Sequence, residues 1–477
     1  MKVLFSHSYF LAFDQKQLAQ SKPYPPLGTI YAASYIREQG HEVALFDSNF
    51  SKGAQEVIPT LEQFKPEILV IYDDGFNYLT KMCLTNMRLA TFEMIRIAKS
   101  KGIFVVVSSS DSTDHYTEYL KNGADIIIIG EAEESLNEII QAKINNSNFS
   151  DLDGIVYLEP NGVTKSKARI VKKDLDELPF PAWDLVDIEK YKSAWKKHGY
   201  FSINIATTRG CPFKCNWCAK PIYGNRYNSH SPQYIVSLIQ MMQKQFDFDH
   251  IWFCDDIFGL KPNWVQEFDK LLVQENITIR YKIQSRADLL LKPDTLQALA
   301  SSGCDEIWIG AESGSQKILD AMDKGTQVEQ IASATLGMKA HNIKPCFFLQ
   351  FGYLGENWED IQLTLNMVKE LMPYDIGVSV SYPLPGTPFY EKVKDELKGK
   401  ANWTDSDELL VMYKSTYQAK FYKYLHRYIH NLFRSKQAKE AIQEGFNPGQ
   451  LLRFLYHSSK AQYGILRVRT SMKKDDL

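Results

Sequence analysis

The sequence predicts an α/β protein in three parts. We expect a doubly wound, Rossmann-like sheet of five parallel strands, then a partial (β/α)6 barrel of the TIM type, then a helical C-terminal region. Short apolar runs alternate with helix-length segments over the first 140 residues, and the same alternation resumes at Ser202. After about Gly399 the strand-like runs cease.

Five short runs rich in β-branched residues predict the first sheet. They are KVLF near the start, HEVALFD (41–47), EILVIY (67–72), IFVVVSS (103–109) and ADIIIIG (124–130). Runs that are nearly all apolar are typical of parallel strands buried on both faces. PLGTIYAASYIREQG predicts a helix between the first two strands, with Gly40 as its C-cap. Ligands of such sheets bind at the carboxyl ends of the strands.

A connector and a second α/β region follow. GIVYLEPNGVTKSKARIV predicts a hairpin with its turn at Pro160–Gly162, and the proline-bearing DLDELPFPAWDLVD is irregular. Six strand candidates then alternate with helical segments, too few for an eight-fold barrel. They are SINIATTRGC, HIWFCDD, IRYKIQS, EIWIGAES, KPCFFLQFG and IGVSVSYPLPGT. We expect domains at 1–145 and 201–395, a linker at 146–200, and a helical domain at 396–477.

The composition limits which binding partners and which cellular compartment are expected. The 477 residues carry 55 Lys and Arg against 57 Asp and Glu, so a formal charge of −2 indicates no nucleic-acid partner. No apolar stretch is long enough for a transmembrane helix, and the first residues lack the apolar core of a signal peptide. Three of the seven cysteines are clustered instead of spread into pairs. A reducing cytoplasm is the expected location.

The cysteine cluster is the strongest chemical signal in the chain. Cys211, Cys215 and Cys218 follow the first strand of the second region, at the rim where βα barrels carry out chemistry. A structural zinc would need a second ligand pair, with only Cys254 near by. A redox disulfide of the C-x2-C pair would leave Cys211 unexplained, and core cysteines do not cluster on a Gly- and Pro-bearing loop. The best fit is a [4Fe–4S] cluster held by the three thiolates, with one of its irons left without a protein ligand.

The C-x3-C-x2-C spacing, with Trp217 before the last cysteine, resembles the radical S-adenosylmethionine (SAM) superfamily. The resemblance implies that the three cysteines hold a [4Fe–4S] cluster and that its open iron binds SAM. Reduction then cleaves SAM to a 5′-deoxyadenosyl radical.

The same resemblance assigns SAM contacts to the ends of successive strands. FGYLGEN looks like the family's G-x-P-G-E turn with Leu354 in place of proline, and PLPGTP resembles its sixth strand end. Arg286 and Asp288 have a simpler alternative as a local salt bridge, Glu312 as a helix cap, and the two aspartates after the second strand as a turn pair. The implied SAM-binding residues are Trp217, Asp255, Asp256, Arg286, Glu312, Ser313, Gly352 and Gly355.

The N-terminal region resembles the cobalamin-binding subclass of this superfamily. YPPLGTIYAASYIREQGHEVALFD (24–47), ADIIIIGEAEESLNEII (124–140) and DELPFPAWDLV (176–186) carry the resemblance. It implies cobalamin held by shape and backbone contacts, without a protein histidine on cobalt. SSSDSTDH replaces the family's Gly-Gly-x-His, and GEAE replaces its GEGE. The alternative is a degenerate Rossmann-like domain that only packs on the barrel and binds no cobalamin. The implied cobalamin-binding residues are Pro26, Leu27, Gly28, Asp73, Ser108, Ser109, Gly130 and Glu131.

The resemblance implies a cobalamin-dependent radical methyltransferase. Its substrate would be an unactivated carbon, or phosphorus, of a small molecule or lipid, and flavodoxin or ferredoxin would supply electrons. Cyclisation, ring rearrangement or oxidation with the same cofactors stays open. A tRNA methylthiotransferase would carry more N-terminal cysteines than Cys83 and an RNA-binding barrel. A non-catalytic metal protein would have no reason to keep polar strand ends.

The C-terminal segment is basic and aromatic. YKSTYQAKFYKYLHRYIHNLFRSK has no acidic residue. The simpler interpretation is a core-packing helix with a solvated Lys and Arg face. The other is a surface for an anionic substrate or for peripheral membrane contact.

Overall fold

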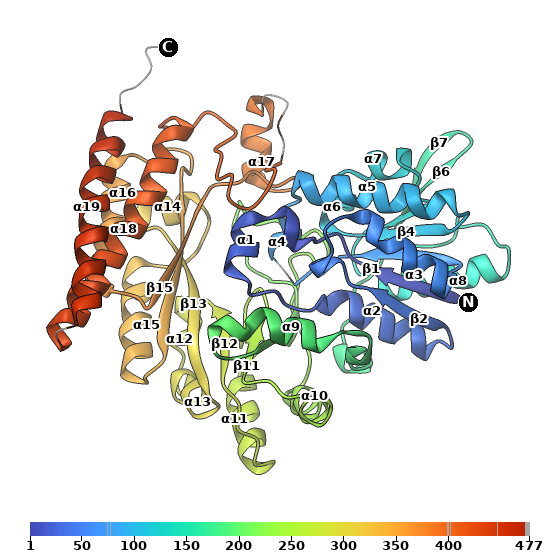
Figure 1. The fold of residues 1–477 in the computed structure, drawn as a ribbon, viewed down its shortest axis with the longest axis horizontal. Helices are drawn as coiled ribbons and strands as arrows, with labels where there is room; N and C mark the ends of the chain where they lie inside the picture. Colours follow the sequence, from blue (N-terminus) through green and yellow to red (C-terminus); the bar gives the residue numbers. More distant parts are fainter. Residues whose placement is uncertain (74, 77, 398–399, 401, 446, 473–477) are drawn as a thin grey trace. The chain divides into compact units, whose positions relative to one another are not determined.

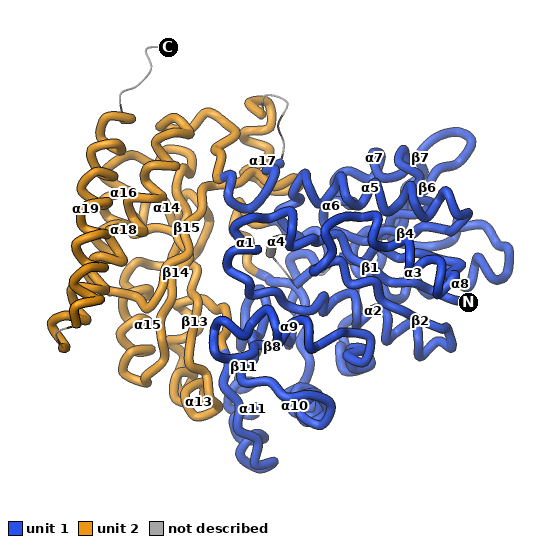
Figure 2. The backbone as a smooth tube through the Cα atoms, viewed as in Figure 1, with its two compact units in different colours: residues 1–212, 219–281, 402–408 blue, residues 213–218, 282–401, 409–477 orange. Residues whose placement is uncertain are grey.

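The structure is a computed structural model that describes all residues except 74, 77, 398–399, 401, 446 and 473–477. The chain divides into two compact units, coloured in Figure 2. Unit 1 comprises Met1–Pro212, Ala219–Tyr281 and Asn402–Glu408, and unit 2 comprises Phe213–Cys218, Lys282–Ala401 and Leu409–Leu477.

Unit 1 contains a seven-stranded sheet in the order β2-β1-β3-β4-β5-β6-β7 (Figure 1). Strands β1 to β5 are parallel, as the five apolar runs predict. The predicted hairpin is also present, and it pairs antiparallel with β5, which extends the sheet by two strands. The strands are β1 (Lys2–Ser6), β2 (Glu42–Phe46), β3 (Ile68–Tyr72), β4 (Phe104–Ser108), β5 (Ile126–Ile128), β6 (Ile155–Glu159) and β7 (Gly162–Lys165).

Helices cover both faces of this sheet, which explains why its strands are apolar throughout. Alternate residues of β1, β3, β4 and β5 form one core with α2 (Leu27–Glu38) and α8 (Glu133–Ile144). The helices α3 (Val57–Phe64) and α5 (Thr85–Ser100) lie on the other face (Figure 1). The predicted helix after Pro26 is thus present, and Gly40 has a left-handed φ of 85° just beyond its end. The remaining helices of unit 1 are α1 (Gln15–Gln20), α4 (Tyr78–Lys81), α6 (Ser110–Asp114), α7 (Tyr116–Lys121), α9 (Ile188–Trp195), α10 (Pro232–Gln245) and α11 (Trp264–Gln274).

The second α/β region has six strands in the order β8-β11-β12-β13-β14-β15, which matches the six predicted strands. The pairs β8–β11, β13–β14 and β14–β15 are parallel. The strands are β8 (Ser202–Ile205), β11 (His250–Phe253), β12 (Tyr281–Ser285), β13 (Cys304–Glu312), β14 (Lys344–Phe351) and β15 (Asp375–Val380). A separate two-stranded ribbon joins β9 (Thr208–Arg209) to β10 (Asn228–Ser229).

Unit 2 ends in two long helices packed side by side, α18 (Ala419–Glu444) and α19 (Pro448–Thr470) (Figure 1). The first of these two helices begins at Ala419. Asn402–Glu408 belongs to unit 1, where the Thr85 N–H donates to the Trp403 carbonyl at 2.9 Å. No helix among the described residues has the length and apolar character needed to span a membrane. The other helices of unit 2 are α12 (Ala287–Leu290), α13 (Thr295–Ser301), α14 (Gln316–Ala321), α15 (Val328–Ala340), α16 (Trp358–Leu371) and α17 (Pro388–Val393).

Candidate cofactor site

The three clustered cysteines lie on an irregular loop and are partly exposed. None of them forms a disulfide. The loop begins at Gly210, whose φ of 80° and close neighbours require glycine, since a Cβ there would lie 2.5 Å from the Arg226 carbonyl oxygen. Cys211 belongs to unit 1, whereas Cys215 and Cys218 belong to unit 2.

In unit 1 the residue before Gly210 is fixed by a buried ion-pair triad. The Arg209 guanidinium contacts the Glu131 carboxylate at 3.0 Å and the Glu133 carboxylate at 2.6 Å, and all three side chains are at most 7% exposed. The Tyr223 ring lies 5.3 Å from the guanidinium. Burial raises the pKa of Glu133, but Arg209 outweighs it and the net pKa is lowered. Arg209 therefore holds a fixed position one residue before the thiol loop.

In unit 2 the loop is fixed by Asn216, between the second and third cysteines. Its backbone N–H donates to the Met322 carbonyl at 3.0 Å, and its Nδ2 donates to the Ala321 carbonyl and the Asp323 carboxylate at 2.8 Å each. The Tyr353 hydroxyl donates to its Oδ1 at 2.6 Å. Asn216 is 2% exposed, so these bonds are shielded from water.

The donor chemistry of the loop fits an iron–sulfur cluster, because three cysteines outside any disulfide are the ligands such clusters use. Among the residues that the structure describes, no three His, Cys, Asp or Glu side chains are gathered into a metal-binding group. Cys211, Cys215 and Cys218 as cluster ligands therefore stay a prediction.

Asp255, at the end of β11, is a buried carboxylate with one oxygen left over. Its Oδ1 accepts hydrogen bonds from the Thr207 N–H at 2.8 Å and from the hydroxyls of Thr207 and Thr208 at 3.0 and 2.6 Å. Its Oδ2 is buried and has no partner in the structure. Burial raises the pKa of Asp255 to about 7, although the bonds from Thr208 and Thr207 oppose the rise. An unsatisfied buried oxygen is the feature expected of a ligand-binding group.

Replacing Asp255 with asparagine is expected to stabilise the cofactor-free chain at pH 8. The unfolded carboxyl titrates near 3.8 and the folded one near 7, so the folded state binds more protons between these values. The free energy of unfolding of the parent therefore falls by up to about 4 kcal/mol as pH rises from 3.8 to 7. Asparagine does not titrate, so this loss is absent from Asp255→Asn. After about 1–3 kcal/mol is subtracted for an unpaired amide, we expect a net gain of about 2 kcal/mol. Urea unfolding at pH 5 and pH 8 measures it, and equal pH slopes in both proteins would contradict it.

Local partners within unit 2 hold the guanidinium of Arg286 in place. It donates to the Asp288 carboxylate at 2.9 Å, to the Lys324 carbonyl at 2.8 Å and to the Thr326 hydroxyl at 3.0 Å. Its guanidinium carbon also lies 3.8 Å from the ring centroid of Phe213, on the thiol loop. The structure thus shows the salt-bridge alternative, with Arg286 supporting the thiol loop within unit 2.

Glu312 pairs with a lysine that sequence reasoning missed. Its Oε1 accepts from the Lys324 Nζ at 2.8 Å, and both side chains are buried. A Cβ on Gly310 would lie 2.5 Å from both groups, so that glycine makes room for the pair. Burial lowers the pKa of Lys324, but Glu312 and then Cys215 outweigh it, and the pKa is raised. The pair thus places a buried cation near Cys215.

Some of the other residues assigned to SAM bond to neighbouring protein groups, and others have polar atoms or space that no protein group uses. Ser313 bonds to the Thr364 hydroxyl at 3.1 Å, and the Gly352 N–H donates to Glu356 at 2.6 Å. Asp256 forms an ion pair with Lys81 in unit 1. The Trp217 Nε1 is buried without a partner, and a Cβ on Gly355 would meet nothing within 4 Å. Trp217 and Gly355 are thus the members of this group with unused contact capacity.

Most side chains assigned to cobalamin are used inside unit 1. Asp73 accepts from the Ser8 N–H and hydroxyl at 2.7 Å each, Ser109 caps α6, and Glu131 pairs with Arg209. Pro26, Leu27 and Gly28 form the start of α2, Ser108 ends β4, and Gly130 has a φ of 86°. Cobalamin binding at these residues through backbone and shape stays a prediction.

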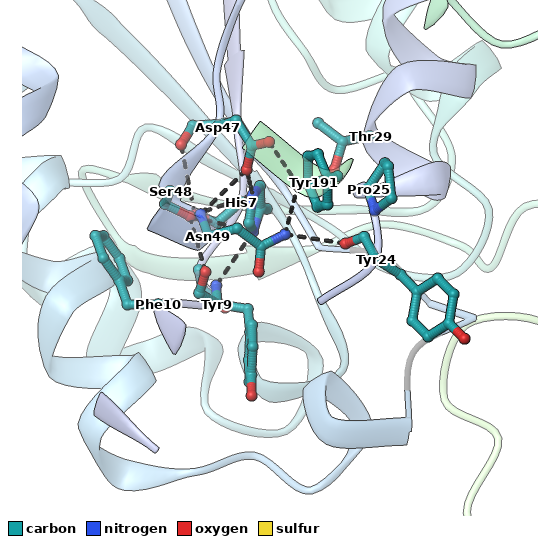
Figure 3. Close-up of polar contacts among 12 residues, drawn as sticks. His7, Tyr9, Phe10, Tyr24, Pro25, Thr29, Asp47, Ser48, Asn49 and Tyr191 are labelled. Carbon is teal, nitrogen blue, oxygen red and sulfur yellow. Dashed lines mark hydrogen bonds and ion pairs between the residues drawn. The ribbon is translucent and has the colours of Figure 1, made fainter. Parts of the chain in front are cut away.

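His7, at the end of β1, lies inside a buried polar cluster that steadies the loop before α2 (Figure 3). Its Nε2 lies 2.9 Å from the Asp47 Oδ1, and its Nδ1 lies 3.1 Å from the Ser48 Oγ. The Tyr191 hydroxyl donates to Asp47, and Asn49 donates to the Tyr24 carbonyl at 3.0 Å. Both ring nitrogens of His7 are therefore engaged within this cluster.

Three comparisons place this geometry among known proteins. Residues 205–368 match the radical SAM superfamily model. An uncharacterized methyltransferase of Pyrococcus horikoshii is 26% identical over 80% of this chain and 81% of its own. The anaerobic magnesium-protoporphyrin IX monomethyl ester cyclase of Rubrivivax gelatinosus is 24% identical over 83% of this chain and 71% of its own length. The solved structure of the cobalamin-dependent S-adenosylmethionine radical enzyme OxsB with aqua-cobalamin bound is 18% identical, with a TM-score of 0.75 over 98% of this chain and 72% of that one. The chain therefore contains a radical SAM domain at residues 205–368, and its overall fold is similar to that of the solved OxsB structure.

Proposed function

We propose that this protein is a cobalamin-dependent radical SAM methyltransferase. Its substrate is a small-molecule or lipid metabolite that is methylated on an unactivated carbon, or on phosphorus. The observation that carries the proposal is the loop with three partly exposed cysteines, anchored by buried Arg209 and Asn216 within a radical SAM domain. The methyltransferase name of the Pyrococcus relative supports the reaction type.

The chain's own residues have distinct roles in this proposal. Cys211, Cys215 and Cys218 hold the cluster, and Lys324, paired with Glu312, is a buried cation near Cys215. The vacant Oδ2 of Asp255 accepts a hydrogen bond from bound SAM. Backbone groups at Pro26–Gly28, Ser108–Ser109 and Gly130 hold cobalamin. When bound, the cluster supplies the electron that cleaves SAM, and cobalamin supplies the carrier for the methyl group.

Cyclisation or oxidation with the same cofactors is the second candidate. The cyclase of Rubrivivax gelatinosus matches more of this chain than the Pyrococcus methyltransferase does. The two reactions share the cluster and SAM, so only the fate of the methyl group distinguishes them.

The test is anaerobic purification with cobalamin supplied, followed by iron analysis and absorbance. We expect about four irons per chain and an intense corrin band, and 5′-deoxyadenosine after addition of SAM and dithionite. Cys218→Ala is expected to keep the corrin band and lose 5′-deoxyadenosine formation. Zinc as the bound metal, or a fully active Cys218→Ala, would overturn the cluster assignment, and iron without corrin would overturn the methyltransferase.

Methyl transfer itself is tested with SAM that carries an isotopically labelled methyl group. The enzyme is incubated with a small-molecule extract, and products are compared by mass spectrometry. A product that gains the label supports methylation, whereas a new product without the label favours cyclisation or oxidation. Electron supply by flavodoxin or ferredoxin in place of dithionite is measured in the same assay.

A further inference from the structure

The last helix of unit 2 has an apolar face turned away from its packing partner. Helix α19 packs on α18 through Ala461, Val468 and Gly464, where a Cβ would lie 3.2 Å from the Tyr428 Cβ. Figure 1 shows the two helices side by side along their length. On a helix of about 3.6 residues per turn, the opposite side should be polar in a helix that meets only water.

That opposite side is instead rich in leucine and tyrosine. The exposed fractions are 69% for Leu452, 54% for Leu455, 59% for Tyr456, 60% for Tyr463 and 59% for Leu466. At roughly 100° per residue these five side chains fall within an arc of about 100°, centred opposite Ala461 and Val468. Single exposed apolar residues are ordinary, but a continuous row of them marks an interaction surface.

The charge on this helix identifies the chemistry of the partner. Between Pro448 and Thr470 there are four basic residues and no acidic one. Arg453, Lys460 and Arg467 recur every seven residues and so line one flank of the apolar arc. Lys460 lies 5.7 Å from the Tyr456 ring and Arg467 lies 5.7 Å from the Tyr463 ring, so cations and tyrosines form one continuous surface.

We propose that α19 binds to the surface of a membrane that contains anionic lipids. The leucines and tyrosines would enter the boundary between headgroups and acyl chains, and the basic flank would contact lipid phosphates. A second copy of the chain is disfavoured, because pairing two such helices would bring two all-basic surfaces together. The proposal concerns location and does not depend on the reaction that the enzyme catalyses.

The test is co-sedimentation of the full chain with vesicles. Vesicles of equal parts phosphatidylcholine and phosphatidylglycerol should bind the protein, phosphatidylcholine alone should not, and added salt should release it. Leu452→Ser with Tyr463→Ser is expected to weaken binding by at least about tenfold. Arg453→Gln with Lys460→Gln is expected to weaken it about 25-fold, since each cation contributes roughly fivefold near an anionic surface.

The matched control is Leu336→Ser with Leu363→Ser, which removes two leucines that are 62% and 50% exposed on α15 and α16 of the same unit. It should bind as the parent does, and all variants should unfold at nearly the same temperature. Absence of binding to phosphatidylglycerol vesicles, or equal weakening by the control, would overturn the proposal. A dimer in light scattering that Leu452→Ser with Tyr463→Ser makes monomeric would assign the surface to a second copy instead.

Discussion

Arg209→Met is expected to lower the free energy of unfolding by about 3–5 kcal/mol, the largest stability effect that we predict. The change leaves Glu131 and Glu133 buried beside each other without the guanidinium that now contacts both. Burial and mutual repulsion then raise the pKa of Glu133, now lowered by Arg209, and raise further the pKa of Glu131, which burial already elevates. The variant's loss should accordingly be greater at pH 8 than at pH 5, because the folded carboxyls recover protons as pH falls. Urea unfolding of the cofactor-free chain at both pH values measures this.

The matched control is Arg37→Met, which breaks a bidentate pair with Asp184 on the surface. Its two bonds are 2.9 Å each, but the side chains are 39% and 57% exposed, so about 0–1 kcal/mol is expected. Adding Glu131→Gln and Glu133→Gln to Arg209→Met should restore part of the stability, since no buried charge is then left unpaired. Similar losses from Arg209→Met and Arg37→Met would show that the buried triad contributes no more than a surface pair.

The fold could be predicted from the sequence because each strand carries its own signal. Within EILVIY, Ile68–Tyr72 forms β3 with every residue buried, as expected of an apolar run in a strand covered on both faces. The hairpin at Pro160–Gly162 was also predicted, but its pairing with β5 was not. Which edge a hairpin joins depends on contacts distant in the sequence.

The candidate site was predictable in its residue types but not in their partners. Cysteine spacing identified the loop, yet nothing near Asn216 indicates its bonds to Asp323 and Tyr353, more than a hundred residues away. The pairing of Lys324 with Glu312 was also missed. Lys324 lies twelve residues after Glu312, beyond the intervening helix, and no sequence pattern links the two. Arg286 shows the converse, since its neighbour Asp288 correctly indicated a local salt bridge.

Asn216→Leu is expected to reduce the iron content of the purified protein severalfold and SAM cleavage by about 10²-fold. Leucine has a similar size, but it removes the amide's bonds to the Ala321 carbonyl, the Asp323 carboxylate and the Tyr353 hydroxyl, at about 0.5–1.5 kcal/mol for each bond lost. The Tyr353 hydroxyl keeps its 3.0 Å bond to the Ala321 carbonyl. At Asn216 the segment would then be held by backbone bonds, from its N–H to the Met322 carbonyl and from the Phe389 N–H to its carbonyl. A displacement of about 1 Å in a positioning segment is enough for a loss of this size.

Asn225→Leu provides the matched control, because Asn225 is exposed and its side chain accepts from Lys220 at 2.8 Å. It should keep its iron and its 5′-deoxyadenosine formation. Tyr353→Phe removes one bond of the Asn216 network, so its loss should be smaller, and combining it with Asn216→Leu should add little, since both changes break the same contact. If Asn216→Leu lowered only the unfolding temperature while iron and SAM cleavage stayed at parent values, Asn216 would stabilise unit 2 without positioning the thiolates. Retained iron with slow cleavage would instead locate its effect in the alignment of SAM.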